Sequence, residues 1–290
     1  MWILLAILSD IHGNLEALLA VIEDAKQQGI TQFAFLGDIM GYGPNPKEVL
    51  AKVQELNPVF CLIGNHEYFI REGQLNYETT IIRAKKDPRE KYSSYAKDSL
   101  SWTIEQLSRK ERTFLANLPK EYYDEENDIM YCHTVYDRSE VKITRTGDLD
   151  FPYIKGKNQA GIILNDPDPP SRIYVIGHTH SPLVYTLEEE QDDLFSFEGC
   201  RGMFYDDPKI TTPEHISISG NEPAIINIGS VGQPRDKDAK ACYIIAEARE
   251  FRFRRVSYPA EITCEKLIAI SKELGNENFA KLGLRLLNGE

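Results

Sequence analysis

The order of apolar runs and helical patterns in the first 65 residues predicts an α/β protein that begins with a parallel sheet. Ile3–Leu8 is an unbroken apolar run, which is typical of a strand buried on both faces. Leu15–Gln28 then carries apolar residues at helical spacing. Two more short runs, Gln32–Leu36 and Val59–Ile63, enclose a second helix that begins at Pro46. Strands joined through helices run parallel, so we expect helices on the faces of this sheet.

Residues with strong positional preferences mark the ends of these helices. Asn14 can cap the first helix, and Gly29 ends it. Pro46 suits the first position of the second helix, which we expect to run to Leu56. The loop before it is rich in glycine. A tight loop at that point leaves the end of the second strand open to a ligand.

The middle of the chain turns helical and richly charged, with helices expected at Tyr92–Leu107 and Lys110–Leu118. A polar hairpin leads into a strand at Ile129–Cys132, and Ile173–Ile176 forms another. The second half reads as β and ends in helices between Glu261 and Leu287 that break at Gly275. Its expected strands are Leu183–Leu187, Leu194–Phe197, His215–Ile218, Ala224–Ile228, Ala241–Glu247 and Phe251–Val256.

One domain that covers residues 1–290 is the simplest organisation, because no repeat, low-complexity linker or sharp change in composition divides the chain. The stretch 188–222 is longer than its hairpins require, which indicates an inserted loop. The segment 138–172 mixes Gly, Pro and Asp with a short helical pattern. We expect it to form a loop-rich cover over one side of any site at the strand ends.

The composition is that of a soluble globular protein, with 42% hydrophobic and 27% charged residues. A net charge of -12 disfavours binding to long nucleic acids or to anionic membranes. The N-terminal apolar run is too short to span a bilayer and lacks a basic flank. Five scattered cysteines without CxxC spacing indicate free thiols in a reducing compartment, so we expect a cytoplasmic protein.

Polar side chains that bind metals follow the predicted strands where those strands end. Five of the six histidines stand at these positions, which scattered structural histidines would not do. Imidazole, carboxylate and amide ligands without thiolate suit divalent manganese, iron or zinc. Two metals need a shared ligand, and the Asp38 carboxylate can face both. The residues concerned are Asp10 and His12, Asp38, Asn65 and His66, His133, and His178 and His180.

Each of these residues taken alone also has an ordinary structural interpretation. Asp10, His12 and Asn65 can be turn residues, and His133 can be a core histidine. Arg235 stays open between a contact to a substrate phosphate, which we favour, and a structural salt bridge. Only the collective pattern outweighs these alternatives.

Three neighbouring residues are expected to be structural. Glu67 can be an ordinary acid at the start of a helix. Strand alternation turns Cys132 away from the side of its metal-binding neighbour, so a buried thiol is expected there. His215 is expected to be an ordinary surface or strand histidine.

The series Asp-x-His, Gly-Asp-x-x-Gly, Gly-Asn-His-Glu, a lone His and Gly-His-Thr-His resembles the calcineurin-like metallophosphoesterase superfamily. It spans Asp10 to His180. The loop at 37–46 and the stretch 227–236 further resemble the small stand-alone bacterial and archaeal phosphoesterases of that superfamily. The resemblance implies a four-layer α/β/β/α sandwich of two mixed sheets, the metallo-dependent phosphatase fold.

The resemblance also implies two divalent metal ions, manganese first and iron, zinc or nickel as alternatives. A metal-bridging hydroxide would attack the phosphorus in line. His66 would be the acid that protonates the leaving oxygen, oriented by its neighbour, while Asp38 would bridge the metals. One metal would be held by Asp10, His12, Asp38 and His180, and the other by Asp38, Asn65, His133 and His178.

The expected activity is hydrolysis of a small phosphomonoester or phosphodiester, with Asn65, His66, Tyr42 and Arg235 contacting the substrate. Protein serine/threonine phosphatases of the superfamily carry Asp-Arg where Gly41 and Tyr42 stand here, so that alternative is weaker. A non-catalytic scaffold is the alternative of another class, but scaffolds typically lose metal ligands that are all present here. The sequence does not set the oligomeric state.

Overall fold

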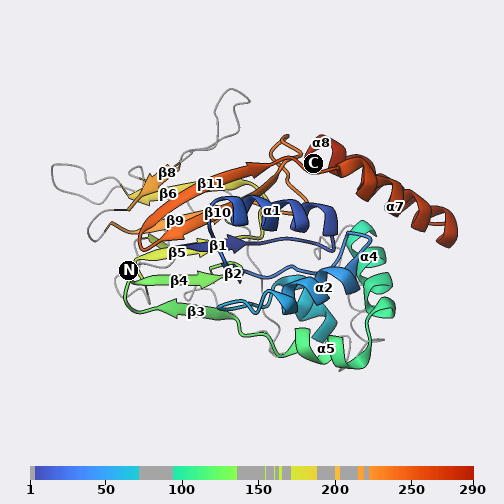
Figure 1. Ribbon diagram of the computed structural model, residues 1–290, viewed down its shortest axis with the longest axis horizontal. Helices are drawn as coiled ribbons and strands as arrows, with labels where there is room; N and C mark the ends of the chain where they lie inside the picture. Colours follow the sequence, from blue (N-terminus) through green and yellow to red (C-terminus); the bar gives the residue numbers. More distant parts are fainter. Residues whose placement is uncertain are drawn as a thin grey trace.

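Two mixed β-sheets face each other at the centre of the protein, with helices outside them (Figure 1). The computed structural model describes residues 4–71, 94–135, 154, 160, 163–164, 171–187, 200–202, 215–218 and 222–290. The strand order is β2-β1-β10-β11-β8 in one sheet and β3-β4-β5-β9-β6-β7 in the other.

The first sheet joins the N-terminal strands to strands from the last third of the chain. β1 pairs in parallel with β2 and antiparallel with β10, so the expected parallel start is correct but covers only one edge. Its strands are β2 (Gln32–Phe35), β1 (Leu5–Leu8), β10 (Ala241–Glu247), β11 (Glu250–Val256) and β8 (His215–Ser217).

The second sheet has three parallel strands, β4, β5 and β9, at its centre. Because parallel strands end at the same edge, the residues after β4 and β5 lie beside each other. Its strands are β3 (Glu121–Asp124), β4 (Ile129–Cys132), β5 (Ile173–Ile176), β9 (Ala224–Ile228), β6 (Pro182–Leu187) and β7 (Cys200–Gly202).

Strand alternation assigns each buried side chain to a layer. Ile7 and Val175 point into the core between the two sheets. Leu8, which follows Ile7 on β1, points to the other face and packs against the outer helices α1 (Leu15–Gln27) and α2 (Pro46–Glu55). The outer face of the second sheet is covered by Val135, Ile154, Ala160 and Leu164. Most of the expected cover at 138–172 lies outside the described residues.

The C-terminal helices lie at the end of the molecule that also carries α4 (Figure 1). α7 contacts α1, and α8 contacts α4. Leu267, Phe279 and Leu282 form a small apolar cluster with Tyr42 of the glycine-rich loop. The remaining helices are α4 (Ser94–Gln106), α5 (Arg109–Ala116), α7 (Ala260–Leu274) and α8 (Glu277–Asn288), with the predicted break at Gly275.

The predicted third strand at Val59–Ile63 is wrong as a regular strand. Cys61 forms a single parallel bridge with Phe35 of β2. The backbone N–H of Leu62 still donates to the Phe35 carbonyl at 2.8 Å, but the next N–H on that side, that of Gly64, donates to the Glu67 carboxylate at 3.0 Å, so the ladder stops. In the stretch 188–222 the described parts include β7 and β8, which lie at the edges of the two sheets, and the expected strand Leu194–Phe197 lies outside the described residues.

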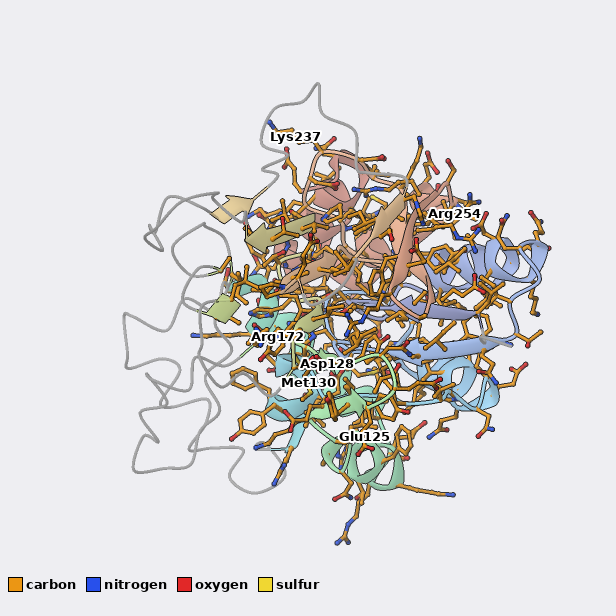
Figure 2. The ribbon with its side chains drawn as sticks, turned by 90° about the vertical axis from the view of Figure 1, so that its left-hand side faces the viewer. Glu125, Asp128, Met130, Arg172, Lys237 and Arg254 are labelled. Carbon is orange, nitrogen blue, oxygen red and sulfur yellow. The ribbon has the colours of Figure 1, made fainter. Side chains whose placement is uncertain are left out.

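The amino edge of the second sheet carries ordinary surface contacts. Figure 2 shows Asp128 close to Arg172, whose backbone N–H donates to the Asp128 carboxylate at 3.4 Å. Arg249 lies 3.9 Å from the same carboxylate. Among the helices of the described segments, none has the length and apolar character to cross a membrane.

Candidate active site

The carboxyl edge of the sheets gathers the buried polar residues that the sequence pattern singled out. Asp10, His12 and His180 form one group, and Asp38, His133 and His178 form a second, with ligand atoms within 4.8 Å of one another in each. All six side chains are buried. Asn65 and His66 lie in the same place, so the structure brings together every residue predicted to bind a metal.

Tight turns, rather than extended strands, aim these side chains. Asp10 and His12 have φ values of 54° and 50°, and Asp38, His178 and His180 also have positive φ. The backbone N–H of Asp10 donates to the Gly37 carbonyl at 3.1 Å, and that of His12 to the Asp38 carbonyl at 3.0 Å. Extended backbone is therefore not what brings the side chains of residues 10 and 12 together. Their convergence depends on left-handed backbone, a conformation that clusters at functional sites.

Backbone carbonyls fix the tautomer of three histidines, as assigned from the hydrogen bonds. Nδ1 of His12 lies 2.9 Å from the Met40 carbonyl, Nδ1 of His180 2.6 Å from the Gln233 carbonyl, and Nδ1 of His133 2.9 Å from the Leu36 carbonyl. A carbonyl only accepts, so the proton of each neutral ring is on Nδ1. Each Nε2 therefore presents a lone pair to the centre of the site, the usual arrangement of metal-binding histidines.

In the first group these lone pairs face one another. Nε2 of His12 lies 3.1 Å from Nε2 of His180, which in turn lies 3.1 Å from Oδ1 of Asp10. Asp10 Oδ1 is buried and accepts no hydrogen bond. Three electron-rich atoms without a donor between them repel each other unless a cation lies among them. The donor set therefore fits a divalent metal ion.

The second group repeats this arrangement and shares a carboxylate with the first. Nε2 of His133 lies 3.3 Å from Oδ2 of Asp38 and 3.2 Å from Oδ1 of Asn65. The same Asp38 oxygen lies 3.7 Å from Nε2 of His12. Asp38 thus stands between the two groups, where one carboxylate can serve two metal ions.

Electrostatics favour a positive ion here. Burial opposes ionisation of Asp38, but His133 and the other imidazoles outweigh it and hold the Asp38 pKa well below its usual range. Burial lowers the pKa of His178 to about 3 and of His180 to about 4, so both rings stay neutral, as a metal ligand must. Burial also disfavours charge on His133, yet the Asp38 carboxylate raises its pKa to about 9. Without a metal, a proton on His133 thus neutralises Asp38, and a metal ion that takes over this role requires the neutral ring with its Nε2 lone pair.

His66 lies beside the metal-ligand groups with one ring nitrogen unpaired. Its backbone N–H donates to Oδ1 of Asp38 at 2.8 Å. Its ring lies 4.7 Å from that of His12 and 4.8 Å from that of Tyr42, between centroids. Nδ1 is buried and has no hydrogen-bond partner among the residues described. Burial, which outweighs the attraction of Asp38, lowers the His66 pKa to about 3.

Glu67 is the residue whose role the sequence interpretation missed. Its fully buried carboxylate accepts three backbone N–H groups, from Asp38 at 2.8 Å, Met40 at 2.9 Å and Gly64 at 3.0 Å. It therefore holds the turn that carries Asp38. Burial and the nearby Asp38 charge raise its pKa to about 7. The Gly-Asn-His-Glu turn was the available signal, because an acid placed at a buried helix start finds free N–H groups.

Gly41 allows His66 to occupy its position. Its φ is +87°, and a Cβ at this residue would overlap Nδ1 of the His66 ring. The backbone of the glycine-rich loop therefore forms one wall of the imidazole pocket, which no other residue type permits.

A loop after β9 braces the first group from the other side. Ser230 Oγ donates to the Asp10 carbonyl at 2.8 Å and accepts from the Gln233 N–H at 2.8 Å. The backbone N–H of Arg235 donates to the His180 carbonyl at 3.2 Å, and its Nη2 to the Gln233 side chain at 2.8 Å. Arg235 also lies over the Tyr42 ring, 5.8 Å from the guanidinium carbon to the centroid. Tyr42 and Arg235 therefore lie at the site, as do the other two predicted substrate contacts, Asn65 and His66.

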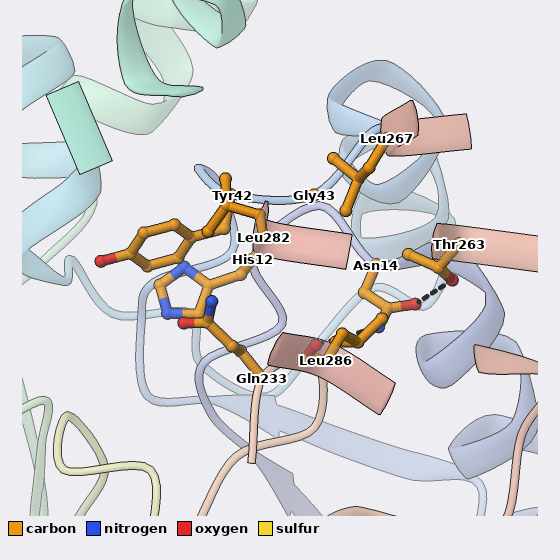
Figure 3. A pocket seen from close by; sticks show the side chains of 10 residues that line it. His12, Asn14, Tyr42, Gly43, Gln233, Thr263, Leu267, Leu282 and Leu286 are labelled. Atoms are coloured by element: carbon orange, nitrogen blue, oxygen red, sulfur yellow. Dashed lines mark hydrogen bonds between the residues drawn. The ribbon is translucent and has the colours of Figure 1, made fainter. Parts of the chain in front are cut away.

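A pocket opens between this site and the C-terminal helices (Figure 3). The space inside it, including the part open to solvent, is about 230 Å³. Figure 3 shows the rings of His12 and Tyr42 side by side near Gln233, with leucines of α7 and α8 on the other side. The pocket is lined by His12, Asn14, Tyr42, Gly43, Gly232, Gln233, Thr263, Leu267, Leu282 and Leu286.

His215 and Cys132, two of the residues predicted to be structural, lie away from the chemistry. His215 is exposed on β8, 2.7 Å from the Glu250 carboxylate. Cys132 is buried against the outer face of the second sheet, as alternation predicted, and burial raises its pKa. Cys61, Cys132, Cys242 and Cys264 are all free thiols.

Comparison with known proteins finds similarity along the whole chain. The sequence profile of the family described as calcineurin-like phosphoesterase matches residues 3–212. An uncharacterised protein of Methanocaldococcus jannaschii, MJ0912, is 30% identical over 267 residues, which cover 91% of this chain and 92% of that one.

Two solved structures extend the likeness to the fold. A metallophosphoesterase from Sphaerobacter thermophilus is 28% identical, with a TM-score of 0.69 and complete (100%) coverage of both chains. The hypothetical protein PH1004 from Pyrococcus horikoshii OT3 shares the fold, with a TM-score of 0.66 at 20% identity and 97% coverage of both chains.

Proposed function

This chain belongs to the calcineurin-like phosphoesterase family, and on that premise we propose that it uses two divalent metal ions to hydrolyse a small phosphomonoester or phosphodiester. Membership makes it a metal-dependent phosphoric ester hydrolase. The observation that supports the dinuclear proposal best is the pair of donor groups that meet at Asp38. We propose manganese as the native metal because imidazole and oxygen donors without thiolate suit it.

The residues divide between the two ions as follows. Asp10, His12 and His180 would hold one, Asn65, His133 and His178 the other, and Asp38 both. When bound, the two ions supply a water of lowered pKa and positive charge for the phosphoryl oxygens. The carbonyls behind His12, His133 and His180 keep each Nε2 free for this task.

His66 would donate the proton that the leaving oxygen needs. A ring with a pKa of about 3 is neutral at pH 7, so the free protein does not hold this proton. The negative charge of a bound phosphoryl group favours the imidazolium and raises that pKa. Substrate binding therefore charges the acid, and its contribution to the rate is about 10²–10⁴.

Tyr42 and Arg235 would contact the substrate. They lie together on the side of His12 and His180, next to the pocket under α7 and α8. Buried free thiols support a reducing, cytoplasmic location.

The test measures manganese-dependent hydrolysis of para-nitrophenyl phosphate and of its bis diester and phenylphosphonate analogues, after chelator treatment. The wild type should turn over at least one of them. His66→Ala should retain both metals, as measured by mass spectrometry. Its turnover should be about 10²–10⁴-fold lower than that of the wild type. A metal-free His66→Ala would overturn the role of His66. Metal bound in the expected amount without turnover of any substrate would favour a scaffold.

A further inference from the structure

We propose that Arg235 selects substrates whose reacting phosphate is a dianion, so that the enzyme prefers phosphomonoesters over phosphodiesters. The inference rests on the proposed function and narrows its substrate class. Two features of the structure support it: the Arg235 guanidinium lies beside the metal-ligand groups, and no carboxylate among the described residues pairs with it. The third argument is the difference in charge between a monoester and a diester.

Arg235 is fixed to the metal-ligand group at both ends. Its backbone N–H donates to the carbonyl of His180, and its Nη2 donates to Gln233, whose carbonyl faces Nδ1 of that same histidine. Its guanidinium lies over Tyr42, whose ring lies 4.7 Å from the ring of His12 between centroids. The charge reaches the site, since it contributes with burial to the lowered pKa of His180.

No carboxylate neutralises this guanidinium in the part of the chain that the structure describes. The next residue, Asp236, pairs with Arg255 instead. Nε of Arg235 is buried and donates no hydrogen bond. An unneutralised, half-buried cation with an unsatisfied donor costs free energy, which an anionic ligand recovers. The structural salt bridge that the sequence left open is therefore absent from the described residues.

The chemistry of the substrate decides which anion fits. When bound, the two metal ions would supply positive charge to the attacking water and to the phosphoryl oxygens nearest to them. The remaining position on phosphorus is a charged oxygen in a monoester and an uncharged ester group in a diester. Arginine binds phosphoryl oxygens through two parallel hydrogen bonds, which an ester group cannot match. Arg235 therefore strengthens binding of the monoester in particular.

The experiment compares kcat/KM for para-nitrophenyl phosphate and bis-para-nitrophenyl phosphate in manganese-loaded protein. Arg235→Gln should lower the monoester value about 10- to 100-fold, the range of a charge-assisted hydrogen bond, and the diester value less than about 3-fold. Arg235→Lys should retain part of the monoester activity because lysine keeps the positive charge. The loss should remain partial because an ammonium group cannot form the two parallel hydrogen bonds of a guanidinium. Arg252→Gln, an exposed arginine on β11, is the matched control and should change neither.

A second measurement needs no turnover. Inorganic phosphate binding to the manganese-loaded protein, followed by calorimetry, should weaken about 10-fold or more in Arg235→Gln at unchanged metal content. An equal loss of both substrates would make Arg235 a brace for the loop, and unchanged phosphate binding would remove it from the site. Either result overturns the inference about Arg235. The proposed function is still supported in that case if the wild type hydrolyses an ester. A wild type that binds phosphate but hydrolyses neither ester would overturn the proposed function alone.

Discussion

Nε2 of His12 and Nε2 of His180 lie 3.1 Å apart, and in both rings Nδ1 faces a backbone carbonyl. Two neutral imidazoles held this way point lone pairs at each other and cannot share a hydrogen bond. The folded protein thus contains an unfavourable contact between two lone pairs and, beside it, an Asp10 oxygen without a hydrogen bond. A cation bound between these atoms would make the contact favourable. Metal binding and folding should therefore be coupled.

The first prediction is that manganese stabilises the chelator-treated protein. At a concentration of one hundred times Kd the gain is about 2.7 kcal/mol, which corresponds to a rise in Tm of roughly 5–10 °C for a chain of this size. His180→Ala should lose one metal per chain and most of that rise. His215→Ala removes an exposed histidine and should retain the full response. A Tm that ignores manganese in differential scanning calorimetry would refute the coupling.

Glu67→Gln should destabilise the protein and loosen the metal site at once. The carboxylate accepts N–H groups with both oxygens, so an amide nitrogen in place of either one faces a donor. We expect a loss of about 1–3 kcal/mol in the free energy of unfolding, measured in urea on chelator-treated protein. Asp38 shares this turn, so the metal content should also fall.

Glu105→Gln provides the control for Glu67→Gln. Glu105 is exposed on α4, and its substitution should change the free energy of unfolding by less than about 0.5 kcal/mol. If Glu67→Gln matched this control in both stability and metal content, the carboxylate would not be what holds the turn.

The sequence predicts which residues gather at this site but not the turns that orient their side chains. Polar residues after buried apolar runs place Asp10, Asp38 and His178 at one edge, because parallel strands end together. The turns themselves were not predictable, since their positive φ values depend on hydrogen bonds to chain segments distant in sequence, such as Asp10 to Gly37. Glu67 illustrates the same limit, because two of its three donors come from residues about thirty positions earlier.

Regular elements were predictable where local pattern and tertiary contacts agree. Cys132 faces outward because β4 keeps its alternation, and α7 ends at Gly275 because that residue adopts φ 61°. The run at 59–63 shows the opposite case, since the Gly64 N–H that would extend its pairing with β2 donates to the Glu67 carboxylate instead. Such competition between partners leaves no mark on the pattern of apolar residues.

The third prediction concerns pH and lies outside the site. Asp24 on α1 accepts Tyr243 Oη at 2.7 Å and two nitrogens of Arg254 at 3.0 and 2.6 Å; Arg254 is labelled in Figure 2. Burial opposes its ionisation, but these donors lower its pKa below 3.8. A lowered carboxyl pKa stabilises the fold above the unfolded value and loses that contribution as pH falls through the folded value.

Asp24→Asn should therefore cost about 1–2 kcal/mol between pH 5 and 8, and this cost should shrink below pH 4. The free energy of unfolding of both proteins is measured in urea after chelator treatment at each pH. Subtracting the two values removes the contribution of every titrating group that wild type and variant have in common. Glu23→Gln, one residue away and exposed, should show no such pH dependence. A cost that stays constant down to pH 3 would show that Asp24 acts through shape alone.

The last prediction separates backbone strain from the space that His66 needs. Gly41 and Gly29 have φ values of +87° and +76°, so alanine meets a similar backbone penalty at both, about 1 kcal/mol or more. Only at Gly41 does the new methyl group overlap the His66 ring, because nothing lies within 4 Å of a Cβ at Gly29. Gly41→Ala should lose more stability than Gly29→Ala because of this overlap, and only Gly41→Ala should lower the manganese-dependent turnover, about 10²–10⁴-fold at full metal content. Equal activity in the two variants, measured as kcat beside thermal stability, would mean that the position of His66 does not limit the reaction.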